Sequence, residues 1–569
     1  MPIIEVNNLS VTYSTQTGFI LKDVTLELQA NETVLILGAS GSGKSTLALT
    51  LNGLIPNSIG HIKSGRVIVD GLDSQHGHAT IIRQKAGIVF QDPSAQFVTL
   101  LVEDEIVFGL ENLRILPEKM NDIVDNALAQ VNMSDARRQS VSHLSGGEKQ
   151  AVALAALLAM QPEILIFDEP TSNIDPTGTK NVFSLIERIK KKRKHTIVII
   201  EHKLDDLIHL VDRVVVLGHE GVIIADGSPL DIFKDQYEVL LNHGIWIPEV
   251  CMFAHDLQRS GLELDPFPLT LDAAHTAISS VFSGQSSLVG TQMPTARNVD
   301  ANTAIEVRNL TFSYGAKQIL NSISLDIAAG DFVALIGANG AGKTTLAQTI
   351  MGILTPLSGT IYINGEAAAN LPANQIVEQI GYVFQNPEHQ FITNTVFDEI
   401  AYALRVRGLD QASVQKKTED MLVRFALSEY KGKSPFMLSH GEKRRLSVAT
   451  MLAMGQSILI FDEPTFGQDQ QNADAIMSLL SDLHAGGCTV IIITHDMRLV
   501  AEYANHVVVL NQGHILFNGL PQDMFAQADL LREAHLQLPP MAELATRLNI
   551  PMVITRQQLQ DTVVAQLGS

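Results

Sequence analysis

Alternating apolar and polar positions open each half of the chain. Residues 4–13 and 305–314 both alternate in this way, and such alternation predicts a strand with one buried face. Unbroken apolar runs stand at residues 33–37 and 164–167, and they predict strands buried on both faces of a parallel sheet. Helical patterns separate the strands. The order predicts an α/β fold, with a mostly parallel sheet, an added antiparallel part and helices in each half.

The whole pattern occurs twice along the chain. The run ILIFDEP stands at residues 164–170 and again at 458–464, and a Leu-Ser motif precedes it by the same number of residues in both copies. Random matches would not keep that spacing. We predict two domains over residues 1–235 and 304–529, small C-terminal extensions over 236–284 and 530–569, and a linker over 285–303 that is rich in Ser, Thr, Gly, Asn and Gln.

A glycine-rich loop that fits G-x-x-x-x-G-K-[ST] follows an apolar strand in each half and precedes a helical run. The glycines let backbone N–H groups converge on a phosphate at a helix N-terminus. Lys44 would reach the β- and γ-phosphates of ATP, and the Ser45 hydroxyl would ligate Mg²⁺. The predicted nucleotide-binding residues are Gly38, Ala39, Ser40, Gly41, Ser42, Gly43, Lys44, Ser45 and Thr46, and in the second half Gly337, Ala338, Asn339, Gly340, Ala341, Gly342, Lys343, Thr344 and Thr345.

Two adjacent acids end the apolar strand of each half. Asp168 would hold Mg²⁺ through water, and Glu169 would polarise the water that attacks the γ-phosphate. Neighbouring residues of a strand point to opposite faces, so the two roles can be divided. Asp462 and Glu463 repeat the pair, and the predicted metal-binding residues are therefore Ser45, Thr344, Asp168 and Asp462, together with the glutamines Gln91 and Gln385.

Three further residue types recur at matching positions. A glutamine after a short apolar strand can contact Mg²⁺ or the attacking water. A histidine after an apolar strand predicts a γ-phosphate contact, although a purely structural histidine is the alternative. A tyrosine upstream of each glycine-rich loop could stack on adenine, with packing into the core as the alternative. These residues are Gln91 and Gln385, His202 and His495, and Tyr13 and Tyr314.

A second phosphate-binding helix start lies in each half, at Ser145, Gly146, Gly147 and Glu148 and at Ser439, His440, Gly441 and Glu442. One domain holds one γ-phosphate, and its own glycine-rich loop already binds it. The simplest prediction is that each of these helices serves the nucleotide of the other domain, which the duplication supplies.

Composition narrows the class of protein. Apolar residues make up 46% of the 569 residues, which excludes a disordered chain. The net charge of −21 argues against a nucleic-acid-binding protein, which is usually basic. The only two cysteines, Cys251 and Cys488, exclude a disulfide framework or a multi-cysteine zinc site and fit a reducing cytosol. We expect Cys488, which directly precedes an apolar strand, to be a buried thiol.

No stretch of the sequence predicts a membrane span or a signal peptide. The N-terminus lacks the basic and apolar regions of a signal, and the most apolar helical run, residues 151–160, is far shorter than the roughly 18 residues that a span needs. A membrane role would therefore come through a partner. The basic run at residues 190–194 ends a helical pattern, so we interpret it as a solvated helix end.

With these motifs in order, the chain resembles the ABC ATPase superfamily over essentially its full length. The P-loop, glutamine loop, LSGGE signature, Asp-Glu strand, D-loop aspartates (Asp175, Asp469) and histidine switch are all present. Residues 90–97 and 384–391, 102–110 and 200–204 further resemble the ATPases of energy-coupling factor (ECF) transporters.

The resemblance implies two ATP molecules sandwiched head to tail. Residues 439–442 would complete the site of Lys44, and residues 145–148 that of Lys343. It also implies a transmembrane coupling (T) subunit and a substrate-binding membrane (S) subunit as partners, and a peripheral location on the cytoplasmic face of the cell membrane. The cargo would be a vitamin or related micronutrient. A thiamine precursor is a family-level expectation, and cobalt, nickel, biotin or another vitamin stay open.

The second half departs from the family pattern at His440, where the signature has glycine. A side chain there could crowd the phosphate or require a less permissive backbone conformation, so we expect two competent but unequal sites. We also expect some of the acids just past the glutamine loops to meet basic residues of the coupling subunit, with a solvated helix as the alternative. These acids are Glu103, Asp104, Glu105, Asp398 and Glu399.

Two other functions remain as alternatives. A double-ATPase subunit of a sugar importer is the closer one, although its second half usually has degenerate motifs. A soluble double-ABC translation factor would carry a long charged linker and a basic surface, and neither is present here.

Overall fold

The structure is a computed structural model that describes residues 2–13, 18–172, 174–282, 302–550 and 553–567. The chain divides into two compact units, Met1–Val281 and Phe282–Ser569. Most of the predicted linker, residues 285–301, lies outside the described residues, and Thr303 already belongs to the first strand of the second unit.

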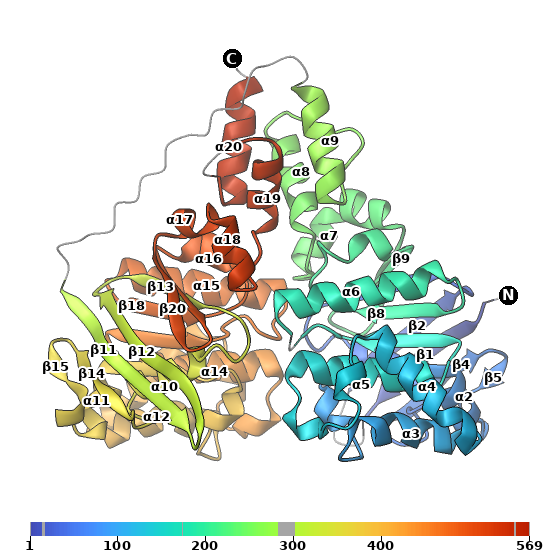
Figure 1. The fold of residues 1–569 in the computed structure, drawn as a ribbon, viewed down its shortest axis with the longest axis horizontal. Coiled ribbons are helices and arrows are strands. Elements are labelled where there is room, and N and C mark those ends of the chain that lie inside the picture. The colour runs from blue at the N-terminus through green and yellow to red at the C-terminus, as the bar shows by residue number, and fades with distance from the viewer. Residues whose placement is uncertain (1, 14–17, 173, 283–301, 551–552, 568–569) are drawn as a thin grey trace. The chain divides into compact units, whose positions relative to one another are not determined.

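The first unit holds two sheets (Figure 1). A six-stranded sheet has the order β10-β9-β3-β8-β7-β6, and all its strands are parallel except β10 at one edge. An antiparallel sheet has the order β2-β1-β4-β5. The strands are β1 (Ile4–Thr12), β2 (Leu21–Leu28), β3 (Thr33–Gly38), β4 (His61–Val69), β5 (Leu72–Asp73), β6 (Ala86–Val89), β7 (Ile164–Asp168), β8 (Thr196–Ile200), β9 (Arg213–Leu217) and β10 (Ile223–Gly227).

Helices cover the parallel sheet of this unit and form a separate helical group. α3, α4 and α5 share one apolar cluster of their own, built from residues such as Ile106, Leu128 and Val152. The helices are α1 (Lys44–Leu51), α2 (Ala79–Lys85), α3 (Val102–Asn112), α4 (Pro117–Gln130), α5 (Gly146–Ala159), α6 (Pro176–Lys191), α7 (Tyr237–Asn242), α8 (Glu249–Arg259) and α9 (Leu271–Val281).

The second unit repeats this plan, with a parallel sheet of order β16-β17-β18-β13-β19-β20 closed by antiparallel β20, and an antiparallel sheet β12-β11-β14-β15. The strands are β11 (Thr303–Tyr314), β12 (Lys317–Ala328), β13 (Phe332–Ile336), β14 (Ser358–Ile363), β15 (Glu366–Ala367), β16 (Ile380–Val383), β17 (Ile458–Asp462), β18 (Thr489–Ile493), β19 (His506–Asn511) and β20 (His514–Gly519).

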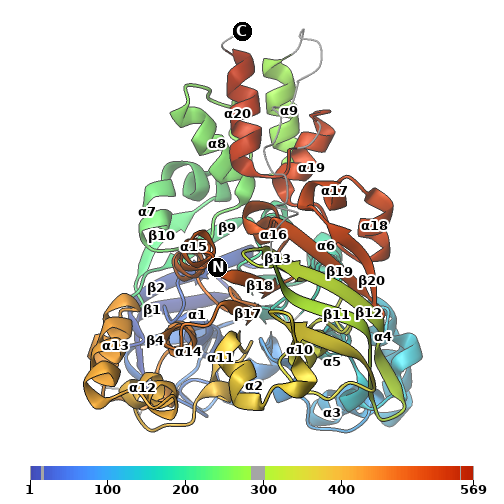
Figure 2. The ribbon, with the colours of Figure 1, turned by 90° about the vertical axis from the view of Figure 1, so that its left-hand side faces the viewer.

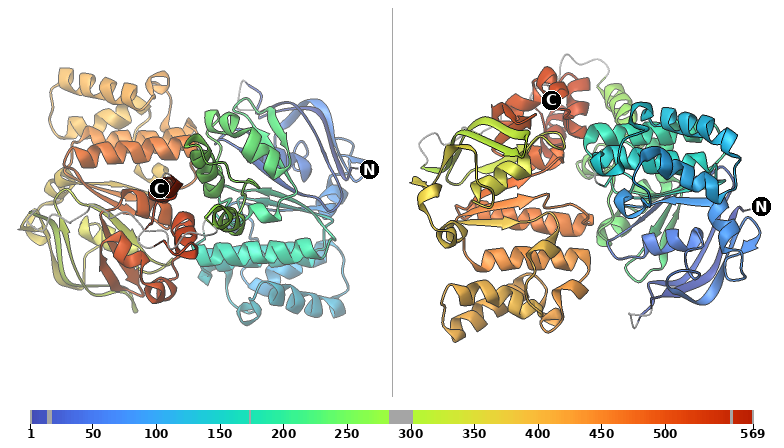
Figure 3. Two further views of the ribbon diagram at one scale, coloured as in Figure 1. Left: turned by 90° about the horizontal axis from the view of Figure 1, so that it is seen from above. Right: turned by 60° about the horizontal axis from the view of Figure 1, so that its bottom comes forward.

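The helices of the second unit fall into the same groups. α12 and α13 lie at the opposite end of this unit from its antiparallel sheet (Figures 2 and 3). The helices are α10 (Lys343–Ile350), α11 (Ala373–Gln379), α12 (Val396–Val406), α13 (Gln411–Arg424), α14 (His440–Ala453), α15 (Gln470–Ala485), α16 (Met497–Tyr503), α17 (Pro521–Phe525), α18 (Ala528–Glu533), α19 (Pro540–Arg547) and α20 (Arg556–Leu567).

The burial pattern explains why these residues form these strands. Every residue of β3, β7 and β17 is buried, as expected for strands covered on both faces. β2 instead alternates buried and exposed positions, because one face of the antiparallel sheet meets solvent. The predicted α/β fold class is confirmed. Among the described residues, no helix combines the length and the apolar character needed to cross a bilayer.

Candidate functional site

The P-loop of the first unit curls around a lysine. β3 ends at Gly38 and α1 begins at Lys44. Gly43 between them has a φ of 95°, a left-handed conformation that disfavours side chains, and a Cβ there would lie 2.7 Å from Leu21. The Lys44 ammonium donates to the carbonyls of Gly38 and Ala39 at 2.8 and 2.9 Å. The loop is therefore preshaped as an anion cradle.

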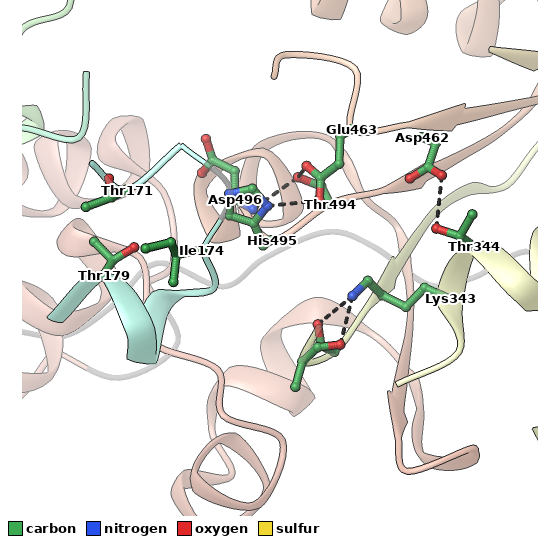
Figure 4. A network of polar contacts seen from close by, with 12 residues as sticks. Thr171, Ile174, Thr179, Lys343, Thr344, Asp462, Glu463, Thr494, His495 and Asp496 are labelled. Carbon is green, nitrogen blue, oxygen red and sulfur yellow. Dashed lines mark hydrogen bonds and ion pairs between the residues drawn. The ribbon is translucent and has the colours of Figure 1, made fainter. Parts of the chain in front are cut away.

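The second unit has the same loop (Figure 4). Gly342 has a φ of 103°, and Lys343 donates to the carbonyls of Gly337 and Ala338 at 2.8 and 3.0 Å.

A hydroxyl and a carboxylate meet beside each P-loop, as predicted for a Mg²⁺ site. Ser45 Oγ donates to Asp168 Oδ1 at 3.1 Å, and Thr344 Oγ1 donates to Asp462 Oδ2 at 3.0 Å. Such oxygen donors suit Mg²⁺, which usually takes few protein ligands and completes its shell with phosphate oxygens and water. Burial raises the pKa of Asp168 to about 6, opposed by its hydrogen bond from Ser45. A bound cation would favour the ionised carboxylate.

The glutamate after β7 lies within hydrogen-bonding distance of the predicted glutamine and histidine. Glu169 Oε2 accepts a hydrogen bond from Gln91 Nε2 at 2.6 Å, and its Oε1 lies 3.0 Å from His202 Nε2. The backbone of Glu169 has a φ of 48°, and its N–H donates to Ile200 O at 2.9 Å. A left-handed non-glycine residue stores strain and is typical of functional sites. The sequence patterns did not indicate this feature.

The second unit holds its glutamate differently (Figure 4). Glu463 also has a left-handed φ, 50°. Its Oε1 lies 2.9 Å from His495 Nδ1, and its Oε2 accepts a 3.5 Å hydrogen bond from Thr494. Gln385 is exposed, and none of the hydrogen bonds identified among the described residues joins its side chain to Glu463. The structure therefore brings the predicted glutamine to the glutamate in the first unit only.

Both signature motifs begin a helix with a capping box. Ser145 caps α5 and Glu148 returns a bond to the Ser145 N–H, and Ser439 and Glu442 do the same at α14. His440 is the first helical residue of α14, where the first unit has Gly146 at the start of α5. This position is right-handed helix, so the expected backbone penalty of histidine is wrong. The side chain of His440 lies outside the described residues.

The two predicted adenine-stacking tyrosines have different surroundings. The Tyr13 hydroxyl lies 3.3 Å from Thr46 Oγ1, and the ring packs against the apolar core of the first unit. Tyr314 is 53% exposed and meets Phe312 edge to face at 4.9 Å between centroids. Tyr13 is half-buried against its own core, and adenine stacking stays a prediction for both tyrosines.

Most of the acids predicted to meet a coupling subunit serve the chain's own fold. Glu105 is buried and accepts hydrogen bonds from the Val98 and Thr99 backbone, and Glu399 repeats this with Ile392 and Thr393. The hypothesis of a partner contact is wrong for these two buried carboxylates.

Two further acids of this set, both half-buried, also have partners in their own unit. Glu103 pairs with Arg137 at 2.8 Å, and Asp398 pairs with Arg405 at 2.9 Å. Asp104 is exposed on α3 and stays a candidate for a partner contact.

Sequence reasoning missed two residues at these sites. Glu201 is buried and accepts from the Thr171 hydroxyl at 2.6 Å and from the His202 N–H at 2.8 Å, so it fixes the histidine. The acid before the histidine was visible in the sequence but had no obvious partner. Tyr382 donates to Asp462 Oδ2 at 2.8 Å, where the first unit has Ile88. Comparing the two halves position by position would have revealed it.

Comparison with known proteins identifies the family. The family model described as ABC transporter matches residues 21–172 and 320–466. A Bacillus subtilis (strain 168) protein named "Putative HMP/thiamine import ATP-binding protein YkoD" is 38% identical over 95% of this chain and 96% of its own length. A Methanosarcina acetivorans "Putative ABC transporter ATP-binding protein" is 36% identical over 99% of this chain and 94% of its own.

A solved structure of CbiO1 from Clostridium perfringens, described as part of the ABC transporter complex CbiONQ, covers 43% of this chain and 99% of its own with 32% identity and a TM-score of 0.38. The family match in both halves and the full-length relatives, read with the two P-loops and strand-end glutamates, show that the chain belongs to the ABC transporter ATPases and carries two ATPase domains.

Proposed function

We propose that this ATPase powers import of a vitamin or related micronutrient through an ECF-type transporter. The observation that carries the proposal is the likeness, over nearly the whole length of both chains, to a protein named for HMP/thiamine import. Both units also keep a lysine in the P-loop, a hydroxyl beside an aspartate, and a glutamate beside a histidine. An importer driven by two hydrolysis sites needs all of these groups in both halves.

In this proposal the halves bind two ATP molecules head to tail, each with Mg²⁺. Residues 439–442 complete the site of Lys44, and residues 145–148 that of Lys343. Bound Mg-ATP supplies the phosphoanhydride and the cation. Ser45 and Asp168 would hold the cation, the P-loop lysines would bind the phosphates, and Glu169 would orient the attacking water, with His202 fixing its carboxylate.

Exposed apolar side chains near the glutamine loops support membrane partners. Leu100 is 79% exposed just before α3, and Phe108 is exposed on that helix. In the second unit, Tyr402 and Val406 are exposed one turn apart on α12, and Met437 is exposed just before α14. Contiguous exposed apolar surface marks interaction sites, and in this proposal these side chains form such a surface on each unit. We propose that they receive the T subunit, which works with an S subunit, so that the chain sits peripherally on the cytoplasmic face of the membrane.

Co-purification tests the transporter class. The tagged full-length chain, extracted from its native membranes in mild detergent, should carry small integral-membrane proteins with it. Leu100→Asp should weaken that association, whereas Leu230→Asp, at another exposed apolar position, should not. Recovery of ribosomes would overturn the proposal in favour of a translation factor. Recovery of a permease with a separate receptor protein would favour the sugar importer.

Transport by the recovered complex tests the cargo. In proteoliposomes, ATP should drive uptake of labelled hydroxymethylpyrimidine or thiamine. The variants Glu169→Gln and Glu463→Gln should each lower ATP turnover, and unequal residual rates would support the expected inequality of the two sites. ATP turnover without uptake of either compound would exclude the thiamine-precursor cargo while leaving the ATPase role intact.

A further inference from the structure

The signature helices of the two units differ in one buried side chain. Arg444 on α14 stands where Gln150 stands on α5, five residues after the capping serine in both. Both side chains are almost completely buried. Gln150 Nε2 has no hydrogen-bond partner among the described residues. Arg444, in contrast, is fully paired.

The Arg444 guanidinium is surrounded by main-chain carbonyls. Nη1 donates to Phe384 O and, at 3.2 Å, to Gln385 O. The other two nitrogens meet three consecutive carbonyls that start at the last residue of β17. Nη2 donates to Asp462 O at 2.9 Å and Glu463 O at 2.8 Å, and Nε donates to Pro464 O at 3.3 Å. The five N–H groups of the side chain therefore match five carbonyls. One cation ties the signature helix to the glutamine loop and to the backbone of the catalytic glutamate.

Burial and the neighbouring carboxylates act in opposite directions on the charge of Arg444. Burial lowers the pKa of Arg444 to about 10, opposed by Asp462 and Glu463, so the group stays charged at neutral pH. Tyr382, the second residue that distinguishes this unit, donates to Asp462 Oδ2 at 2.8 Å. The first unit has Ile88 and Gln150 at these two positions. Its strand-end acids lack both the cation and the phenol.

Two further contacts join the same elements in the second unit. Lys443 pairs with Glu388 at 2.6 Å, and Ser447 exchanges hydrogen bonds with Gln390 at 2.7 and 3.0 Å. The first unit has Ala153 in place of Ser447, and among its described residues Lys149 donates to the Ser94 hydroxyl at 3.2 Å rather than pairing with an acid. In the second unit, α14 and the glutamine loop are thus joined by charged and paired contacts.

We propose that Arg444 is a positioning residue for ATP hydrolysis in the second unit, because it holds the backbone of Gln385 and Glu463 in register with the signature helix. In the first unit Gln150 stands at this position, and its Nε2 has no partner among the described residues, so in this proposal the two strand ends are held with different firmness. The inference rests on the proposed role of Glu463. The inference about Arg444 is independent of the expectation about His440, because Arg444 lies on the buried side of α14.

Steady-state kinetics of the full-length chain test the proposal. Arg444→Gln, which installs the residue of the first unit, should lower kcat about tenfold. If Glu463→Gln leaves a residual kcat above a tenth of the wild-type value, Arg444→Gln should instead lower kcat to that residual value. The KM for ATP and the affinity for a fluorescent ATP analogue should stay within about twofold, because the P-loop is untouched. Arg445→Gln is the matched control: it removes a neighbouring guanidinium that bonds Asn472 instead, and should leave kcat nearly unchanged.

Two further variants separate positioning from folding. Arg444→Lys keeps the charge but offers three N–H groups from one atom, so it should restore the thermal midpoint more than kcat. Should Arg444→Gln not fold, the double variant Tyr382→Ile with Arg444→Gln reproduces the packing pair of the first unit and should fold with low kcat.

Three results would overturn the proposal: full kcat in Arg444→Gln or in the folded double variant, full rescue by lysine, or equal losses of kcat and nucleotide affinity. If Arg444→Gln and Glu463→Gln both keep full turnover, the proposed role of Glu463 fails together with this inference. If Glu463→Gln is impaired and Arg444→Gln keeps full turnover, only the inference about Arg444 fails.

Discussion

Removing the Glu105 carboxylate should loosen the turn between the glutamine loop and α3. All three of its hydrogen bonds reach one oxygen: Oε2 accepts from Val98 N at 3.1 Å, and from Thr99 N and Thr99 Oγ1 at 2.9 Å each. The side chain is only 7% exposed, so water cannot readily replace it. Glu399 makes the same set of bonds in the second unit, which shows that this is a built-in feature of the fold.

The structure sets the size of the effect. A hydrogen bond to a charged group contributes about 1.5–3 kcal/mol, and a buried donor left unpaired costs about 1–3 kcal/mol. Three donors that share one acceptor are not additive, so we expect Glu105→Ala to cost about 3–5 kcal/mol locally. Glu105→Gln can place its carbonyl oxygen where Oε2 lies, keeping three neutral bonds, and should cost about half as much.

Hydrogen exchange of the Val98 and Thr99 amides measures this cost directly. A local loss of about 3 kcal/mol should speed exchange there about a hundredfold in Glu105→Ala, with a smaller acceleration in Glu105→Gln. Asp104→Ala, at an exposed neighbour on the same helix, is the control and should leave both amides unchanged. Unchanged exchange in Glu105→Ala would refute the reasoning. If Glu105→Ala lost binding to the membrane partner while the Val98 and Thr99 amides exchanged at the normal rate, Glu105 would again be a candidate for a partner contact.

Three other expectations follow from the sites. Chelating Mg²⁺ should abolish turnover of the full-length chain, and Ser45→Ala should raise the Mg²⁺ concentration needed for half-maximal turnover by about tenfold or more, because the hydroxyl beside Asp168 is a predicted ligand; an unchanged requirement would contradict this. The Cys488 thiol is half-buried, not fully buried as we expected, and this partial burial raises its pKa to about 11. At pH 8 iodoacetamide should therefore modify it about a hundredfold more slowly in the folded than in the unfolded chain. The neutral thiol is the form that folding favours, so its contribution should be lost as the pH rises above about 8.5; equal labelling rates at pH 8 would refute the assignment. Ser145→Ala should destabilise α5 by about 1 kcal/mol through loss of its cap, visible as faster exchange of the Glu148 amide, and Ser142→Ala is the control.

Most of the fold could be predicted because the patterns that indicate it lie within short stretches of sequence and occur in both halves of the chain. Apolar runs and glycine-rich loops mark buried strands and P-loops whatever their distant surroundings. The strand predicted over residues 164–167 is β7, which extends one residue further to Asp168. What it could not predict depends on long-range contacts. Nothing near Glu105 indicates that its carboxylate turns back onto Val98 and Thr99. Likewise, the sequence around Arg444 predicts an ordinary exposed cation on a helix. Its burial against main-chain carbonyls depends on residues that are distant in the sequence.

The left-handed backbone of Glu169 and Glu463 means that these two residues lower the stability of the folded state. A non-glycine residue in this region costs about 1–3 kcal/mol, and glycine or asparagine would relieve part of it. Selection for thermal stability alone would therefore favour replacing both glutamates, and, in the role that we propose for them, the stabilised protein would lose ATP turnover. Any thermostabilisation of this chain therefore needs a selection that also scores turnover, so that positions 169 and 463 are kept.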